Sequence, residues 1–126
     1  MGTLELKNLS KSFGDTKVIE DLTLKINDGE RVVFLGPSGC GKSTILRMIS
    51  GIESVSDGQI LFDDKDVTSY EPGERDIAMV FQNYALYPHM SVEKNITYAL
   101  KRNKVPQEEI NQRLDQVLSI LDLKHL

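Results

Sequence analysis

Hydrophobic and polar positions alternate along two stretches near the start of the chain. Leucines alternate with polar residues at 4–6, and leucine and isoleucine do so at 22–26. Alternation with a period of two is typical of strands that have one buried face. A turn signal, Asn27-Asp28-Gly29, then leads to RVVFL at 31–35, whose run of apolar residues favours a fully buried strand. Residues 4–35 are therefore expected to be β-rich.

Two shorter apolar runs further along the chain predict additional strands. QILF at 59–62 follows a turn signal at Asp57-Gly58, and IAMVF at 77–81 is another run of the buried type. Asp63-Asp64 comes directly after the first of these runs and favours a polar turn rather than a metal site. The middle of the chain is thus expected to alternate between loop, helix and strand.

Three segments instead repeat apolar residues at helical spacing. One follows Lys42 and ends before Gly51, a residue type that commonly follows a helix. The other two begin after Ser91 and after Pro106, which sit where helix starts place such residues. Helices combined with strands in this order predict an α/β fold. The apolar faces are Ile45, Leu46 and Ile49; Val92, Ile96 and Leu100; and Ile110, Leu114, Val117, Leu118 and Leu121.

A glycine-rich loop joins the run at 31–35 to the first helical segment. Gly36, Gly41, Lys42 and Ser43 fit the pattern G-x-x-x-x-G-K-[ST]. Glycines permit the positive φ angles with which several backbone N–H groups converge on a phosphate, and the helix N-terminus adds partial positive charge. Lys42 can reach β- and γ-phosphate oxygens, and the Ser43 hydroxyl suits Mg²⁺. Strand, loop and helix in this order predict a phosphate-binding site rather than a chance turn.

Composition and charge exclude several classes of function. The chain has 126 residues, 40% of them hydrophobic, and a formal net charge of −4, so it lacks the basic footprint of a nucleic-acid-binding protein. Its single cysteine excludes an internal disulfide and fits a reducing compartment. No apolar run approaches the roughly 18 residues of a membrane helix, and the N-terminus has no signal-peptide pattern. These features predict a cytoplasmic chain that forms one modest domain or part of a larger one.

The loop GPSGCGKST at 36–44 and the stretch DIAMVFQNYALYPHMSVEKNI at 76–96 resemble the N-terminal portion of the ATP-binding subunit of an ABC transporter. The similarity runs from about residue 4 to the end of the chain. Within it, VFQNYALYPHMSV at 80–92 is similar to the importer branch that serves sugars and related small solutes.

This resemblance implies a P-loop NTPase fold of the ABC ATPase type, with an N-terminal antiparallel β strip and a truncated helical subdomain. Residues 1–126 would be the N-terminal part of a single ATP-binding domain. About 1–90 would form its β-rich core with the P-loop, and about 91–126 the start of its helical subdomain.

The resemblance also gives roles to particular residues. The family has an aromatic residue that stacks on adenine where Phe13 stands, although Phe13 taken alone would be an ordinary, partly buried aromatic side chain. Lys42 and Gln82 are implied as catalytic residues, Ser43 and Gln82 as Mg²⁺ ligands, and ATP and Mg²⁺ as cofactors. The implied ATP-binding residues are Phe13, Gly36, Pro37, Ser38, Gly39, Cys40, Gly41, Lys42, Ser43 and Thr44.

Gln82 follows an apolar run and would emerge at a strand end near the phosphates. Its amide can bind Mg²⁺ through oxygen or orient a water molecule. A lone glutamine at a strand end is usually only a surface residue, and it is the resemblance that favours the functional role.

Residues 83–90 are apolar and aromatic, yet interrupted by Pro88, which suits a loop that meets another protein. The resemblance implies that about 83–100 contact a membrane-spanning transporter subunit, which would hold this chain at the inner face of the cell membrane. It also implies a second ATP-binding subunit in the full-length protein. The alternative is a loop packed on its own domain. His89 is expected to be a structural member of the loop rather than a catalytic base.

Several parts that the family needs for hydrolysis have no counterpart in these residues. The family uses an apolar strand that ends in Asp-Glu, an LSGGQ-type signature and a later histidine. ILFDD at 60–64 lacks the glutamate and lies before Gln82, whereas the acidic strand of the family lies after the corresponding glutamine. The chain is therefore expected to bind nucleotide and to hydrolyse little by itself.

Two other functions are compatible with a phosphate-binding loop. A small-molecule P-loop kinase is disfavoured because strands at 4–26 precede the loop and no arginine-rich lid segment is found. A non-catalytic nucleotide-binding or assembly module is the second alternative. The favoured interpretation is an ATPase subunit that couples ATP hydrolysis to the import of a carbohydrate or related small solute.

Overall fold

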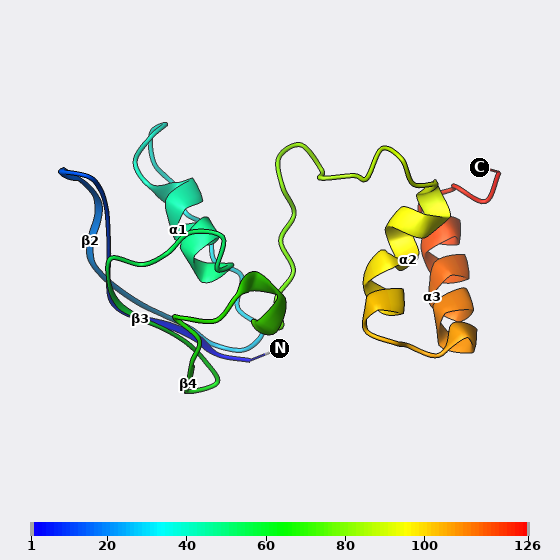
Figure 1. Cartoon of the computed structure of the whole chain (residues 1–126), viewed down its shortest axis with the longest axis horizontal. Coiled ribbons are helices and arrows are strands. Elements are labelled where there is room, and N and C mark those ends of the chain that lie inside the picture. Colours follow the sequence, from blue (N-terminus) through cyan, green and yellow to red (C-terminus); the bar gives the residue numbers. More distant parts are fainter. Residues whose placement is uncertain (1, 126) are drawn as a thin grey trace. The chain divides into compact units, whose positions relative to one another are not determined.

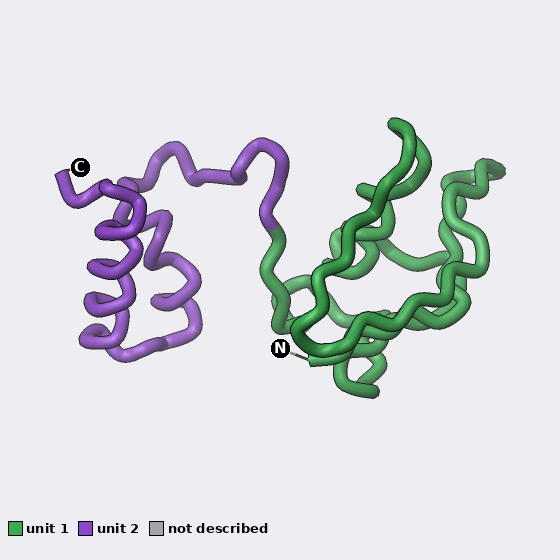
Figure 2. Tube along the Cα trace, turned by 180° about the vertical axis from the view of Figure 1, so that it is seen from behind, with its two compact units in different colours: residues 1–79 green, residues 80–126 purple. Residues whose placement is uncertain are grey.

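The computed structural model describes residues 2–125 and divides into two compact units, residues 1–79 and 80–126 (Figure 2). Each unit contains its own helices or strands (Figure 1). That both belong to a single ATP-binding domain stays a prediction.

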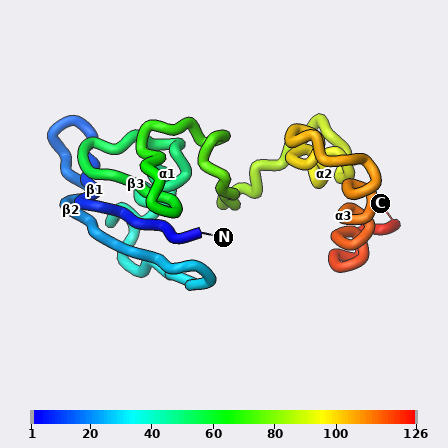
Figure 3. Tube along the Cα trace, turned by 90° about the horizontal axis from the view of Figure 1, so that it is seen from below, coloured from blue at the N-terminus to red at the C-terminus, as the bar shows by residue number. Residues whose placement is uncertain are grey.

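Unit 1 is built on a four-stranded sheet in the order β2-β1-β3-β4 (Figures 1 and 3). The central strand β1, Leu4–Phe13, pairs with β2, Thr16–Ile26, and with β3, Asp57–Phe62. The short strand β4, Lys65–Asp66, pairs with β3. All three pairings are antiparallel. The predicted N-terminal antiparallel β strip is therefore confirmed.

The core of unit 1 lies between this sheet and helix α1, Lys42–Ile49 (Figure 1). Leu6 in β1 pairs with Leu24 in β2 and with Ile60 in β3, so apolar side chains from three strands meet on one face. The alternation of apolar and polar residues predicted this face. The buried cluster consists of Leu6, Leu9, Ile19, Ile45, Met48, Ile60 and Val67.

Helix α1 turns a somewhat different face to this core than the sequence predicted. Ile45 and Ile49 do pack against the core, but Leu46 is 47% exposed and Met48 is fully buried. Residues three and four apart share one side of a helix, and 45, 48 and 49 meet that spacing. The prediction that Leu46 faces inward was wrong because Met48 fills this place instead.

Of the two turns predicted at Asp57-Gly58 and Asp63-Asp64, the structure contains the second but not the first. Asp63-Asp64 connects β3 to β4 with φ angles of 47° and 62°, as in a two-residue hairpin turn, so the predicted polar turn is confirmed. Asp57-Gly58 instead forms the first two residues of β3. A Cβ at Gly58 would lie 2.4 Å from the carbonyl oxygen of Asn8, so glycine allows β3 to approach β1 closely where their register shifts.

The runs at 31–35 and 77–81, both expected to be buried strands, are not strands in the described structure. Val33, Leu35 and Val80 are 74%, 88% and 87% exposed. A wholly apolar strand is stable when neighbouring strands satisfy its backbone and other layers cover both its faces. Residues 2–125 provide no sheet partner for either run, so both predictions were wrong for this chain.

Arg75 closes the C-terminal end of α1. It follows a 3-10 turn, η1, at Pro72–Glu74, and is only 4% exposed. Burial lowers the pKa of its guanidinium, and nearby Glu71 opposes this effect. A positive charge at a helix C-terminus is favourable. The guanidinium donates to the carbonyl oxygens of Met48, Ile49, Thr68 and Tyr70 at 2.8, 3.0, 2.8 and 2.9 Å.

Unit 2 contains two helices that lie side by side, α2 at Val92–Arg102 and α3 at Gln107–Ile120 (Figure 1). Ser91 caps α2, since its hydroxyl accepts a hydrogen bond from the Lys94 N–H at 3.2 Å. α3 begins directly after Pro106. Both predicted helix starts are confirmed. Across residues 2–125, none of the helices combines the length and the apolar character that crossing a membrane requires.

Candidate nucleotide-binding site

The loop at 36–41 turns an extended segment into α1. Gly39 and Gly41 have φ angles of 80° and 101°, in the left-handed region that favours glycine. Gly41 has little room for a side chain, because a Cβ there would lie 2.5 Å from Cδ1 of Ile19 in β2. The positive φ expected of the loop glycines is thus present at both positions, and at Gly41 the absence of a side chain also lets the loop pack against β2.

The N-terminus of α1 offers free donors to this loop. Gly41 makes no side-chain cap, and the first turn holds no acidic residue. The first N–H groups of a helix have no partner within the helix and carry partial positive charge. Residues 36–40 are exposed. An exposed glycine-rich loop and the N-terminus of a helix therefore lie next to each other, as in an anion-binding site.

Lys42 folds back over the loop. Its Nζ donates to the carbonyl oxygens of Gly36 and Pro37 at 2.6 and 2.7 Å, and lies 3.5 Å from Sγ of Cys40. Within the described part of the chain, no carboxylate lies within ion-pair distance of this ammonium. Its positive charge is therefore contacted by neutral carbonyl and thiol groups. A negatively charged phosphate would form a stronger hydrogen bond with it.

The first turn of α1 also carries two hydroxyl groups. Ser43 is exposed and Thr44 is half-buried. Residues 2–125 contain no group of three or more His, Cys, Asp or Glu side chains that could hold a metal ion. Mg²⁺ is usually bound by one or two protein oxygens together with substrate phosphates and waters. The Ser43 hydroxyl suits that arrangement, so the residues fit a magnesium nucleotide.

Phe13 is the last residue of β1 and belongs to the same unit as the loop. It is 48% exposed, so part of its ring is open to a planar ligand. Nζ of Lys11 lies over the ring, 4.8 Å from its centroid. Sequence reasoning gave Lys11 no role, although the two-residue period of a strand would have indicated that it shares a face with Phe13.

Gln82 lies in unit 2, apart from the unit that holds the loop and Phe13. It is exposed and begins a turn at 82–85, in which the Tyr84 N–H donates to the carbonyl oxygen of Phe81 at 2.9 Å. Its position after an apolar run is as expected, but the run at 77–81 is not a sheet strand. A metal site shared by Gln82 and Ser43 stays a prediction.

Asn95 of α2 fixes the loop at 83–90. Its Oδ1 accepts from the Tyr87 N–H at 2.9 Å, and its Nδ2 donates to carbonyl oxygens of the same loop, that of Tyr87 at 3.2 Å among them. His89 contacts the Tyr87 ring edge-on, with centroids 6.1 Å apart. A hollow of about 360 Å³ lies between the loop and α2, lined by Tyr84, Ala85, Leu86, Tyr87, Asn95, Ile96, Tyr98 and Ala99.

Comparison with known proteins identifies the family. A family model described as "ABC transporter" matches residues 19–126, most of the chain. The chain belongs to the ABC transporter family. The resemblance carried by the loop at 36–44 and the stretch at 76–96 is confirmed.

Two relatives of the chain are named as import proteins. The chain is 55% identical to the "sn-glycerol-3-phosphate import ATP-binding protein UgpC" of Bordetella avium, and the match covers 100% of this chain but 35% of the relative. It is 51% identical to the "maltose/maltodextrin import ATP-binding protein MalK" of Klebsiella aerogenes, covering 100% of this chain and 43% of that relative. The chain thus spans 35% and 43% of the lengths of these two proteins.

A solved structure supports the same fold. The whole chain superposes on 56% of MJ1267, an ATP-binding cassette of an ABC transporter, with a TM-score of 0.79 and 29% sequence identity. The fold is therefore that of an ABC ATPase, a P-loop NTPase. ATP is the nucleotide that this family binds, and it is the ligand against which the loop at 36–44 should be tested.

Proposed function

We propose that this ABC transporter chain binds MgATP through the loop at 36–44 and, in the full-length protein, couples ATP hydrolysis to solute import. The observation that supports this most directly is the geometry of Lys42. Its ammonium folds over the loop at the N-terminus of α1 with only carbonyl and thiol partners. A lysine and free helix N–H groups at one place form an anion-binding arrangement.

Each part of the proposed site has a distinct task. The exposed ring of Phe13 stacks on the base, while the N–H groups of 36–44 and Lys42 hold the phosphates. Ser43 and Gln82 supply oxygen ligands for Mg²⁺, and Gln82 orients the attacking water. The metal, when bound, neutralises charge on the β- and γ-phosphates.

The relatives indicate the class of solute and partner. Because the named relatives import glycerol-3-phosphate or maltose and maltodextrin, we propose a carbohydrate or related small solute. The partner would be a membrane-spanning subunit at the inner face of the cell membrane. Its contact surface would be about 83–100, where Tyr84 and Leu86 are 77% and 70% exposed. A second ATP-binding subunit would complete the assembly.

Equilibrium binding tests the phosphate site. Lys42→Ala should weaken ATP binding about 10- to 100-fold, since a hydrogen bond to a charged group is worth roughly 1.5–3 kcal/mol. The measurement is calorimetric titration with ATP and with inorganic triphosphate in the presence of Mg²⁺. Lys17→Ala is the matched control, because it removes an exposed lysine of β2 with the same change in net charge.

Two results would contradict this proposal. One is wild-type chain that binds neither ATP nor triphosphate. The other is Lys42→Ala with the affinity of Lys17→Ala. Transfer of phosphate from ATP to a small metabolite, rather than to water, would instead favour a kinase.

A further inference from the structure

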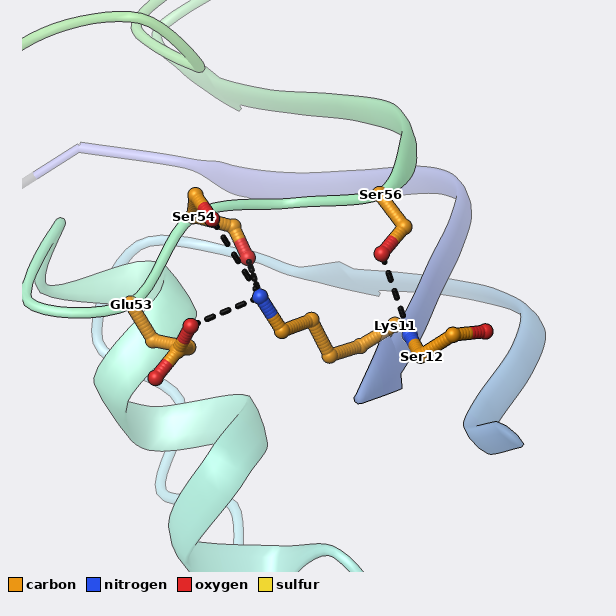
Figure 4. Close-up of polar contacts among 5 residues, drawn as sticks. All are labelled: Lys11, Ser12, Glu53, Ser54 and Ser56. Atoms are coloured by element: carbon orange, nitrogen blue, oxygen red, sulfur yellow. Dashed lines mark hydrogen bonds and ion pairs between the residues drawn. The ribbon is translucent and has the colours of Figure 1, made fainter. Parts of the chain in front are cut away.

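Lys11 is buried in the middle of a polar cluster near the end of β1 (Figure 4). Only 7% of its side chain is exposed. Its Nζ lies 2.6 Å from Oε1 of Glu53 and donates to the carbonyl oxygen and Oγ of Ser54 at 2.7 and 3.2 Å. An ammonium has three N–H donors, and these three acceptors use all of them. The position of this charge is therefore closely defined.

The acceptors belong to the segment that leaves α1. The Glu53 N–H donates to the carbonyl oxygen of Arg47 at 3.1 Å, which ties this segment to the last turn of the helix. Nearby, the Ser12 N–H donates to Oγ of Ser56 at 3.0 Å (Figure 4). The Lys11 hydrogen bond lowers the pKa of the Glu53 carboxyl, with the charges of Lys11 and Arg47 acting in the same direction. These contacts connect the end of β1 to the segment that follows α1.

The ring of Phe13 contacts the ammonium of Lys11. Nζ of Lys11 is 4.8 Å from the centroid of the Phe13 ring, within the range of a cation–π contact. The ammonium therefore supports part of the ring and limits its rotation, while the remaining surface stays open, since Phe13 is 48% exposed. The contacts to Glu53 and Ser54 are enough to connect β1 to the segment after α1. The contact to the Phe13 ring is additional to that connection.

We infer that Lys11 is a positioning residue for the nucleobase: held by Glu53 and Ser54, it orients the Phe13 ring so that an adenine can stack on its open face. This inference rests on the proposed function. It also links the two ends of the nucleotide, because α1 begins at Lys42 in the phosphate loop and the segment that follows α1 holds Glu53, the partner of Lys11. Fixing the ring in advance reduces the entropy lost when the base binds.

The test separates binding of the base from binding of the phosphates. Affinities for MgATP and for inorganic triphosphate with Mg²⁺ are measured by titration calorimetry for the wild type and for Lys11→Met, which keeps a similar side-chain length without the charge. Lys7→Met is the matched control, since Lys7 lies on the same strand, pairs with Glu5 at 3.3 Å and is 44% exposed. Phe13→Ala, Lys11→Met/Phe13→Ala and Lys11→Arg complete the set.

The ratio of ATP affinity to triphosphate affinity is the deciding quantity. Lys11→Met should lower this ratio about three- to tenfold, in line with the cost of immobilising one side chain, and leave triphosphate affinity unchanged. Lys7→Met should leave the ratio unchanged, and Lys11→Arg should restore most of it. Adding Lys11→Met to Phe13→Ala should cause no further loss, because Lys11 acts through the ring.

Other outcomes overturn the inference. An unchanged ratio in Lys11→Met shows that the ring needs no support from Lys11. Equal loss of ATP and triphosphate binding shows that Lys11 only maintains the fold. Failure of the wild type to bind triphosphate contradicts the proposed phosphate site itself, whereas triphosphate binding without any preference for ATP contradicts only the base site.

Discussion

Gly41 combines two constraints at the start of α1. Its φ angle of 101° is in the left-handed region, and an added Cβ would lie 2.5 Å from Cδ1 of Ile19 and 3.4 Å from the Val18 carbonyl oxygen. The first constraint shapes the turn that presents the helix N-terminus to the loop. The second places the loop directly against β2. Because Gly41 has no Cβ, it can adopt the backbone conformation of the loop and can also pack against β2.

Gly41→Ala should destabilise unit 1 by about 2 kcal/mol or more, from the strained φ angle and from overpacking. Gly29→Ala is the control, because Gly29 has a φ of 79° and nothing within 4 Å of an added Cβ. It should cost only about 1 kcal/mol, from the φ angle alone. Urea unfolding of dilute protein, followed by circular dichroism, measures both. Equal losses would show that contact with Ile19 is unimportant.

Residue patterns predicted the phosphate loop better than the side chains around it. The glycine, lysine and serine positions of the loop follow from a short motif with a clear chemical requirement, and Gly39 and Gly41 do adopt positive φ. Lys11 carries no such motif, since its partners Glu53 and Ser54 lie more than forty residues away along the chain. Leu46 was misplaced because Leu46 and Met48 are both apolar, and only the packed sheet decides which one is buried.

At the scale of elements, Arg75 determines how α1 ends. Its guanidinium donates to the carbonyl oxygens of Met48 and Ile49 in the last turn of α1, and the Met48 oxygen also accepts from the Gly51 N–H at 3.1 Å. Gly51, at φ 76°, leaves space for it, because an added Cβ would lie 2.7 Å from Nε of Arg75. The glycine was predicted as a helix stop, but the arginine that completes the stop comes from 24 residues further on (75 − 51). Such a distant partner gives no local sequence signal.

Arg75→Met should destabilise unit 1 by about 3 kcal/mol or more. The change keeps an unbranched apolar stem but removes the donor to the carbonyl oxygens of Ile49, Thr68 and Tyr70, and each unsatisfied buried group costs roughly 1–3 kcal/mol. Chemical unfolding at pH 7 measures the loss. Arg113→Met is the control, since Arg113 is exposed on α3 and forms a surface ion pair with Glu109 one helical turn away. A loss as small as in this control would contradict the proposed role of Arg75.

Strand formation by 31–35 and 77–81 could not be judged from composition. Both runs have the apolar character of central strands, yet an apolar run becomes a strand only when partners flank it. The antiparallel strands β1, β2 and β3 carry their own partners within residues 4–62 and were predicted correctly. The resemblance implies a further strand that ends in Asp-Glu and follows Gln82, and the 126 residues contain no counterpart of it.

At the scale of the whole molecule, these exposed runs predict self-association of the 126-residue chain. Val33 and Val80 are 74% and 87% exposed in extended segments without a sheet partner, and exposed apolar backbone of this kind pairs readily with another chain. Light scattering after size-exclusion chromatography should find oligomers at high concentration. Val33→Lys/Val80→Lys should increase the monomer fraction. A monomeric wild type with one cooperative transition at high temperature would contradict this prediction.

The last prediction concerns catalysis by the chain in isolation, which should bind ATP and hydrolyse almost none. The groups proposed to hold the base and the phosphates, namely Phe13 and the loop at 36–44 with Lys42, lie in unit 1. Hydrolysis requires in addition a positioned water and stabilisation of the charge that develops in the transition state. The acidic strand and signature that serve these tasks in the resemblance have no counterpart in the sequence. Loss of several cooperating groups should remove most of an acceleration of at least about 10⁶-fold.

Steady-state phosphate release by purified chain, with Lys42→Ala as the control, measures this directly. We expect equal and negligible release from both, although only the wild type binds ATP well. The comparison excludes a contaminating ATPase, because such an activity would not depend on Lys42. Turnover on the order of 1 s⁻¹ that disappears in Lys42→Ala would lie within the usual enzyme range. It would mean that residues within this chain position the water, and Gln82, which lies beside the exposed loop at 83–90, would be the first to substitute.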